Sequence, residues 1–173
     1  MLKKSFFITI LMVLVLACSF AENQTITVKA SPYSFQYVTR TPGFSSKYGF
    51  GVEAGYRYTV WKNLSVGAEL KYSNYSYSKL STAYHVISLL PNVGWTQNFG
   101  DKWSATANLG AGIQARLVEH KKALFFAMNL YLGAGYKVTE TITVTAGADL
   151  GLAFQKGSND FSVDAMLGAA IAL

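Results

Sequence analysis

Apolar and polar positions alternate along the segment 103–118. The odd positions from Trp103 to Leu117 are apolar, whereas the even positions from Ser104 to Arg116 are polar or glycine. A strand turns successive side chains to opposite faces, whereas a helix with 3.6 residues per turn would spread both sets around its circumference. The segment is also long enough to cross a bilayer at a tilt. It therefore predicts a strand with one apolar and one polar face.

The same alternation recurs along most of the chain, interrupted by short stretches that are typical of turns and loops. The first strand changes phase near Ser31 and Pro32, and a one-residue bulge would repair it. Pro91 removes a hydrogen-bond donor from the fourth strand. The predicted strands are 25–40, 47–61, 65–74, 84–99, 103–118, 124–137, 142–155 and 161–173.

Eight strands joined by short connections predict an all-β fold, an eight-stranded antiparallel up-and-down transmembrane β-barrel with a polar filled interior and short loops. An even number of strands lets such a sheet close, and closure is required because lipid offers no partner to an unpaired backbone group. The longest apolar runs, 123–128 and 165–173, are much shorter than the roughly 20 residues of a membrane helix.

The ionisable residues of the predicted strands gather on the polar face, four acids and four bases, and the apolar face has none. Eight strands enclose a space that side chains just fill, so we expect these charges to pair across the lumen. If Trp61 and Ser65 flank the turn, Arg57 lies opposite Glu69, and Glu53 is diagonal to Lys71. A gate for ions or small solutes is the alternative interpretation. The predicted lumen ion-pair network is Glu53, Arg57, Glu69, Lys71, Arg116, Lys137, Asp149 and Asp164.

Composition supports a lipid-facing surface. Only 14% of the 173 residues are charged, against about 25% in a typical soluble domain. Aromatic residues mark the predicted strand ends, as in the aromatic girdles of membrane barrels: Trp61, Phe99, Trp103 and Tyr136 at one end, and Tyr48, Tyr84, Phe154 and Phe161 at the other. A soluble lipid-binding barrel, the main alternative, would place its charged face outside.

Residues 1–21 have the pattern of a secretory signal peptide, which leaves 22–173 as the barrel domain. Lys3 and Lys4 precede an apolar core, and a small-x-small cleavage site ends at Ala21. Removing the two lysines lowers the formal net charge from +6 by two, to about +4. Alternatively, 15–18 is a lipoprotein cleavage box and Cys18, the single cysteine, is acylated.

Basic residues gather in the connections that we expect to face the cell exterior. Glu119 and Asp160 are the acids among them. Such a basic outer rim would attract the phosphates of lipopolysaccharide, and a solvated rim without a partner is the alternative. The rim residues are Arg40, Lys47, Lys79, Lys121, Lys122 and Lys156.

The signal, the eight alternating strands and the terminal segment 168–173 resemble the small outer-membrane barrels of the outer-membrane protein A, outer-membrane protein X and opacity-protein type. The resemblance implies a multi-pass barrel in the bacterial outer membrane. It also implies that the barrel-assembly machinery reads Gly168, Ile171 and Leu173 as an assembly signal. The chain departs from that pattern at Leu173, where Phe is usual, and at Met166, where a polar residue is common.

Three classes of function fit such a barrel, because the fold itself specifies none. A structural or surface-interaction role is favoured by a filled lumen, and a narrow channel or carrier for small solutes is the alternative. A lipid-modifying enzyme would need a nucleophile, a base and an acid together. His85, Ser88, Glu119 and His120 have no spacing that enforces a triad, so we do not expect an enzyme.

The remaining expectations concern ligands and partners. No Cys/His cluster suggests a metal, and we expect no cofactor. The positive charge is too dispersed to indicate nucleic acid. The expected partners are outer-membrane lipid, lipopolysaccharide phosphates and the barrel-assembly machinery. We expect a monomer, although the sequence leaves the oligomeric state open.

Overall fold

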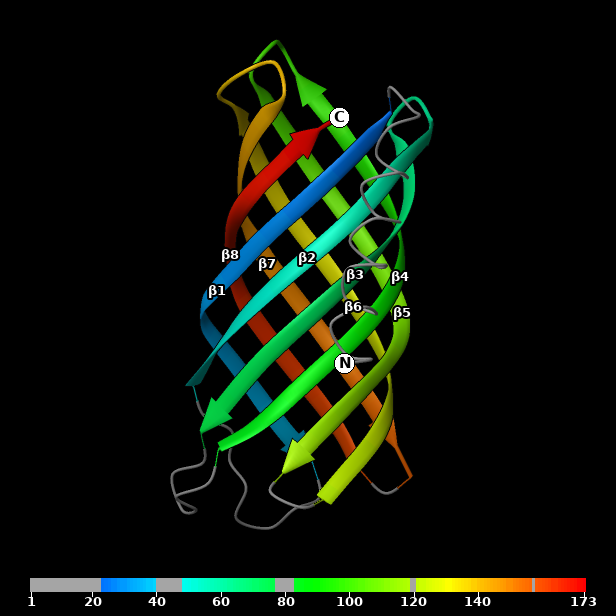
Figure 1. The fold of residues 1–173 in the computed structure, drawn as a ribbon, viewed down its shortest axis with the longest axis vertical. Coiled ribbons are helices and arrows are strands. Elements are labelled where there is room, and N and C mark those ends of the chain that lie inside the picture. Colours follow the sequence, from blue (N-terminus) through cyan, green and yellow to red (C-terminus); the bar gives the residue numbers. More distant parts are fainter. Residues whose placement is uncertain (1–22, 40–47, 77–82, 119–120, 157) are drawn as a thin grey trace, which may run out of the picture.

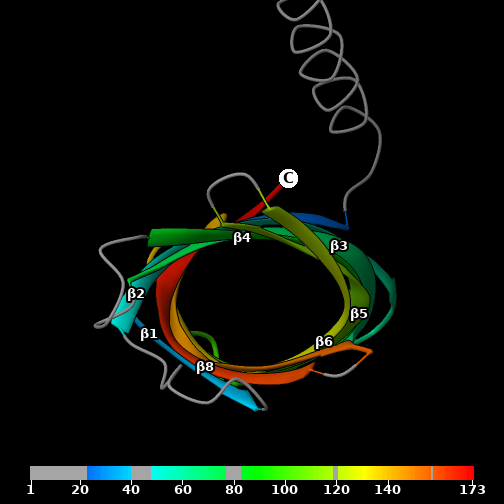
Figure 2. The ribbon, with the colours of Figure 1, turned by 90° about the horizontal axis from the view of Figure 1, so that it is seen from below.

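The computed structural model describes residues 23–39, 48–76, 83–118, 121–156 and 158–173, which form eight strands. Each strand pairs antiparallel with the next, and the last pairs with the first, so the sheet closes into the predicted barrel. The strands are tilted against the long axis (Figure 1), and they form a ring when seen along it (Figure 2). They are β1 (Gln24–Thr39), β2 (Tyr48–Trp61), β3 (Leu64–Ser76), β4 (Ala83–Phe99), β5 (Trp103–Val118), β6 (Lys121–Lys137), β7 (Ile142–Gln155) and β8 (Ser158–Ala172).

The two ends of the barrel differ. One end, here called the turn end, carries the connections 62–63, 100–102 and 138–141 together with the start of β1 and the end of β8. The backbone amide of Leu173 donates to the carbonyl of Gln24 over 3.0 Å there. The opposite end is called the loop end. The predicted signal peptide lies outside the described residues, among which no helix is long and apolar enough to span a membrane.

The bulge predicted in β1 is confirmed. The register of β1 shifts by one residue against β2 between Ser31 and Ser34, and against β8 between Ala30 and Tyr33. Pro32 and Tyr33 both face outward and are exposed. Ser31 Oγ donates to the carbonyl of Tyr33 over 2.7 Å, which holds the bulge. As a result, the inward positions change from odd to even numbers along β1.

The turn between β2 and β3 differs from the prediction. Thr59 pairs with Ser65 and Trp61 with Leu64, so the turn is shorter and one residue of β2 is extra. Lys62 has a φ of 43°, which closes this tight turn. The register is therefore two residues away from the expected one. Glu53 lies directly opposite Lys71, whereas Arg57 lies opposite Gly67 and only diagonal to Glu69.

Pro91 interrupts the sheet on one side only. Its pairing with Ala68 in β3 is regular. Pairing with β5 runs to Leu89 and resumes at Asn92 in the same register. Because proline has no backbone N–H, the gap is expected, and its exposed ring faces outward. β4 therefore continues through a local defect.

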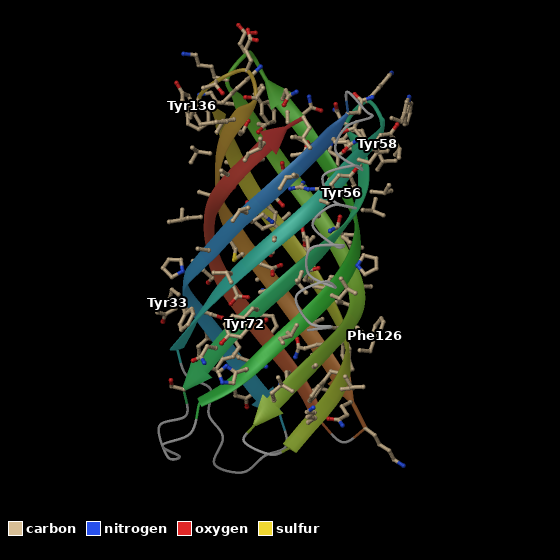
Figure 3. All side chains as sticks on the ribbon, viewed as in Figure 1. Tyr33, Tyr56, Tyr58, Tyr72, Phe126 and Tyr136 are labelled. Atoms are coloured by element: carbon tan, nitrogen blue, oxygen red, sulfur yellow. The ribbon has the colours of Figure 1, made fainter. Side chains whose placement is uncertain are left out.

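The exterior of the barrel is apolar. Val28, Leu70, Ile113, Leu124 and Leu167 are each more than half exposed. In Figure 3 the side chains of Tyr33, Tyr58, Phe126 and Tyr136 also project away from the ribbon. So broad an exposed apolar surface is unusual for a soluble monomer and suits hydrocarbon.

Exposed aromatic side chains lie at both ends of this surface. At the turn end Trp61, Phe99 and Trp103 are exposed, and the Trp103 and Tyr136 rings meet edge to face at 5.0 Å between centroids. At the loop end Phe154 and Phe161 are exposed, 37% and 39% respectively. The side chains of Tyr48 and Tyr84 lie outside the described residues. The girdle positions that are described thus lie at the strand ends.

The interior is filled, but not only by polar groups. Leu90, Phe125, Ala127 and Ala153 face inward and form a buried apolar cluster toward the loop end. The strict alternation of polar and apolar positions breaks in β6, where Phe125 and Phe126 are adjacent. Phe125 faces inward and Phe126 outward. Toward the loop end, the interior is therefore partly apolar.

Candidate functional site

The candidate site is a layer of buried ions that crosses the lumen. In its first cluster, Lys29 of β1 contacts two carboxylates. Its Nζ lies 2.6 Å from Glu53 Oε1 and 3.7 Å from Glu69 Oε1, and all three side chains are about 1% exposed. The same ammonium lies 3.8 Å from the centroid of the Tyr131 ring. Asn108 Nδ2 donates to Glu69 Oε1 over 3.0 Å, so the cluster links β1, β2, β3, β5 and β6.

The second cluster is formed by Lys71, Asp149 and Asp164. The two aspartates lie directly opposite each other on β7 and β8 and are fully buried. Two like charges in this position repel each other. Lys71 reaches across from β3 and pairs with both, its Nζ 2.5 Å from Asp149 Oδ2.

Neutral donors complete the second cluster. Asn129 Nδ2 donates to Asp149 Oδ1 over 3.0 Å. Ser34 Oγ donates to Asp164 Oδ1 and lies 2.9 Å from the hydroxyl of Tyr75. Buried charges require such partners, because each ion costs several kcal/mol to remove from water. These contacts join strands from opposite sides of the ring.

A third ion pair lies nearer the loop end than the two clusters do. Arg116 pairs with Asp160, and its guanidinium carbon lies 4.5 Å from the centroid of the Phe125 ring. Gln36 Nε2 also donates to Asp160 Oδ2, over 3.3 Å. Asp160 is 3% exposed, so it belongs to the interior and not to the outer rim, where the sequence analysis placed it.

The predicted network is thus brought together in part. Glu53, Glu69, Lys71, Arg116, Asp149 and Asp164 all take part in buried ion pairs. Arg57 is buried but forms no ion pair with any described residue. Lys137, at the end of β6, is exposed at the turn end.

Besides Asp160, the interior residues Lys29 and Tyr131 were not predicted from the sequence. Lys29 shares the parity of Thr27 and Ser31, opposite to Val28 and Ala30, and this pattern was enough to place it inside. Its omission followed from the phase change in β1. Tyr131 was missed because an aromatic residue on the polar face has no charge to mark it, yet it is only 2% exposed.

The ion layer separates two spaces of different size. On the turn side is a cavity of about 260 Å³ with Lys29, Arg57 and Tyr131 among its lining residues. On the loop side is a cavity of about 30 Å³ that Lys71 and Asp160 line together with Tyr75 and Leu90. The lumen therefore contains a wide polar vestibule on one side of the ions and very little space on the other.

The predicted basic rim is described only in part. Lys122 and Lys156 are exposed at the loop end. Lys121 lies in β6, but its side chain is not described. Arg40, Lys47 and Lys79 fall outside the described residues.

The arrangement of His85 and Ser88 argues against a hydrolytic triad that contains both residues. The two residues are three apart on β4, so they point to opposite faces of the wall. Ser88 is buried in the lumen and lies 3.4 Å from Gln114 Oε1. His85 Nδ1 lies 2.8 Å from the Tyr72 hydroxyl and 3.1 Å from Asn74 Nδ2. Glu119 and His120 lie outside the described residues. Within the described part of the chain, no group of three metal-binding side chains is found.

The proposed assembly residues lie in β8 and at its end. Ile171 pairs with Ile26 of β1 and Ile142 of β7, and its side chain is 39% exposed. Leu173 is also exposed. Gly168 is required by packing: a Cβ there would overlap the carbonyl of Val28 and lie 2.7 Å from the Lys29 Cα.

A closed eight-stranded antiparallel barrel with an apolar exterior and an ionic interior defines a class, the small outer-membrane barrels. Comparison with solved structures confirms this fold. The chain resembles Neisserial surface protein A, with a TM-score of 0.71, 14% identity, and coverage of 87% of this chain and 97% of the other. It also resembles Ail, the attachment invasion locus protein of Yersinia pestis, with a TM-score of 0.55, 15% identity, and coverage of 87% and 99%.

A second structure of Ail, in complex with the heparin analogue sucrose octasulfate, matches with a TM-score of 0.57 and 14% identity, covering 87% of this chain and 99% of that one. No family model matches the chain, and no curated protein does. At these identities the likeness establishes the architecture. The resemblance to small outer-membrane barrels that the sequence suggested is therefore confirmed as a fold.

Proposed function

We propose that this protein is a bacterial outer-membrane barrel with a structural and surface-interaction role, whose lumen is closed to passage by its buried ions. The observation that carries the proposal is the ion layer. Two groups of ions, Lys29 with Glu53 and Glu69 and Lys71 with Asp149 and Asp164, join β1, β2, β3, β7 and β8 across the lumen. Opening a path through them would leave charges unpaired at a cost of several kcal/mol.

The test is conductance in a planar lipid bilayer. The reconstituted protein should show no steady open state, because ion pairs and packed side chains fill the lumen beyond the turn-side cavity. Removing the bridging cation and both acids in Lys71→Ala/Asp149→Ala/Asp164→Ala should create measurable current. A steady ohmic conductance of the unaltered protein would instead favour the alternative, a narrow channel for small solutes.

A second proposed activity is binding of anionic groups at the loop end. Lys122 and Lys156 are exposed there, and the structurally similar Ail has been captured with a heparin analogue. Phosphates of lipopolysaccharide are the anions that an outer-membrane rim would meet. Binding of lipopolysaccharide to the protein should weaken several-fold in Lys122→Gln/Lys156→Gln and with added salt. Lys102→Gln, at the turn end, is the matched control, and equal weakening in that variant would contradict the proposal.

Export and assembly complete the proposal. Residues 1–21 would direct secretion and be removed, and the barrel-assembly machinery would read Ile171 and Leu173. Intact mass should correspond to a chain that begins at Glu22. A lipidated chain beginning at Cys18 would overturn that cleavage site. Polar substitution of Leu173 should slow insertion by the purified machinery, but Gly168 is unsuitable for this test because its substitution disturbs packing.

A further inference from the structure

Half of the residues that line the turn-side cavity carry a hydroxyl group. Hydroxyl groups are hydrogen-bond donors that can rotate toward an anion. Gly133 and Ala134 add little bulk to the wall, and Lys62 and Asn63 lie in the turn that borders it. The hydroxyl residues of the lining are Thr25, Thr59, Ser65, Thr96, Ser104, Thr106, Thr141, Thr143 and Thr145, with Tyr131.

The charge of the lining is positive. Lys29, Arg57 and Lys62 line the cavity, and Glu140 is the one acid among the described residues that do so. The ammonium of Lys29 already pairs with Glu53 and Glu69, and these two acids do not line the cavity. Among the described residues, Arg57 is therefore the buried cation of the lining that has no direct carboxylate partner.

Arg57 has unused binding capacity. It is 8% exposed, and its Nη1 donates a long hydrogen bond of 3.4 Å to Asn108 Oδ1. Its Nε–H has no hydrogen-bond partner among the described residues, and no described carboxylate forms an ion pair with the guanidinium. A guanidinium offers five donors in a planar fork that matches two oxygens of a phosphate.

We propose that the turn-side cavity is a binding site for a small tetrahedral oxyanion, inorganic phosphate or a phosphomonoester, held by Arg57 and the surrounding hydroxyls. The anion enters from the turn end past Lys62 and stops at the ion layer. The cavity volume of about 260 Å³ exceeds the space of several waters and admits such an anion with part of its hydration. This site is separate from the loop-end rim and does not depend on the proposed surface role.

The test uses the protein purified from membranes in an uncharged detergent and titrated with inorganic phosphate at constant ionic strength. The Nε–H resonance of Arg57 in ¹H–¹⁵N spectra should shift and saturate, while chloride at the same ionic strength leaves it unchanged. Arg57→Gln should weaken binding at least ten-fold by calorimetry. Glycerol phosphate is titrated in parallel. The compound with the lower dissociation constant shows whether the site prefers a phosphomonoester or free phosphate.

Two control variants separate a built site from diffuse charge attraction. Lys62→Gln removes a charge at the mouth and should weaken binding less than Arg57→Gln, whereas Lys156→Gln at the loop end should leave binding unchanged. Ser104→Ala keeps every charge and should weaken binding several-fold. An unmoved Arg57 resonance in the unaltered protein, or equal losses in the Arg57 and Lys62 variants, would overturn the proposal. The resonance measurement needs no variant, so it tests phosphate binding even if Arg57→Gln fails to fold.

Discussion

At the scale of single residues, Lys71 holds together two acids that would otherwise repel each other. Asp149 and Asp164 are fully buried on neighbouring strands, and the ammonium of Lys71 contacts both. Removing one member of a buried ion pair costs more than the pair itself contributes, because the partner keeps its charge without compensation. The second cluster thus depends on Lys71 for the charge that keeps its two aspartates together.

The first prediction concerns this lysine. Lys71→Met should lower the free energy of unfolding by about 3–5 kcal/mol, as expected when a buried charge loses its partner. Urea unfolding in lipid vesicles, followed by tryptophan fluorescence, measures the change. Lys156→Met, which removes an exposed charge, should change stability by no more than about 0.5 kcal/mol. The combination Lys71→Met/Asp149→Asn/Asp164→Asn should recover most of the loss.

The second prediction concerns a glycine that the first ion cluster needs. A Cβ at Gly94 would overlap Asn108 Oδ1 and lie 2.8 Å from Ser65 Oγ. Gly94→Ala should therefore displace Asn108 from Glu69 and lower the free energy of unfolding by about 1–3 kcal/mol. Gly100, at a φ of 67°, has open space around it. Gly100→Asn, in which asparagine tolerates that conformation, should cost much less, and an equal loss in both variants would contradict the steric explanation.

Residue type and position along the strands together predicted most of the ionic interior, because a charge on the polar face in the middle of a barrel strand has only the lumen to enter. The partners were harder to predict. Lys71 pairs with residues of β7 and β8 across the lumen, and no local pattern specifies a contact that far along the chain. Arg57 illustrates the same limit, since it was assigned to Glu69 on the basis of an assumed turn.

At the scale of elements, the alternating pattern predicted the strands and their order in the barrel well, and the register between β2 and β3 less well. β5 and β7 have the expected bounds, whereas β6 and β8 begin three residues earlier than predicted. The error between β2 and β3 came from the turn, where Lys62 adopts a positive φ and one residue of β2 is extra. A two-residue shift leaves every side chain on the same face, so the hydrophobic pattern cannot detect it.

The third prediction uses the bulge of β1. Deleting Pro32 removes the extra residue and leaves Lys29 and Ser34 facing inward, so the chain should still refold. Deleting Ala54 from β2, where pairing is regular, turns the rest of that strand inside out and should prevent folding. Gel mobility of heated and unheated samples reports closure of the barrel. Failure of both deletions would show that the bulge itself is needed.

At the scale of the whole molecule, the main feature is which face of the sheet points outward and which points into the lumen. The exterior offers large exposed apolar side chains, and the described lumen holds the buried ions. Soluble barrels that carry lipids have the reverse arrangement. Hydrocarbon is the environment in which this exterior is stable.

The fourth prediction tests this assignment with two matched pairs of neighbouring residues. In a chain carrying Cys18→Ser, a lipid-dissolved quencher should reach a fluorophore at Leu89→Cys and Val66→Cys, which are 48% and 40% exposed in the unaltered protein. Ser88→Cys and Ser65→Cys, 4% and 7% exposed before substitution, should be protected because their side chains enter the lumen. Quenching of the serine positions in preference to their neighbours would contradict the membrane orientation.

The pairing of β1 with β8 also has a consequence for biogenesis. Among the eight barrel strands, β1 is synthesised first and must find β8, which is synthesised last, with Thr25 to Thr39 aligned against Ala172 to Asn159. Until β1 and β8 pair, each of the two strands presents a row of unpaired backbone N–H and C=O groups to any other chain. Contacts so distant in sequence form slowly. The incomplete sheet is therefore exposed to aggregation until β8 has been made and has paired with β1. A periplasmic chaperone that covers the edges of β1 and β8 would therefore prevent most aggregation in the interval before these two strands pair.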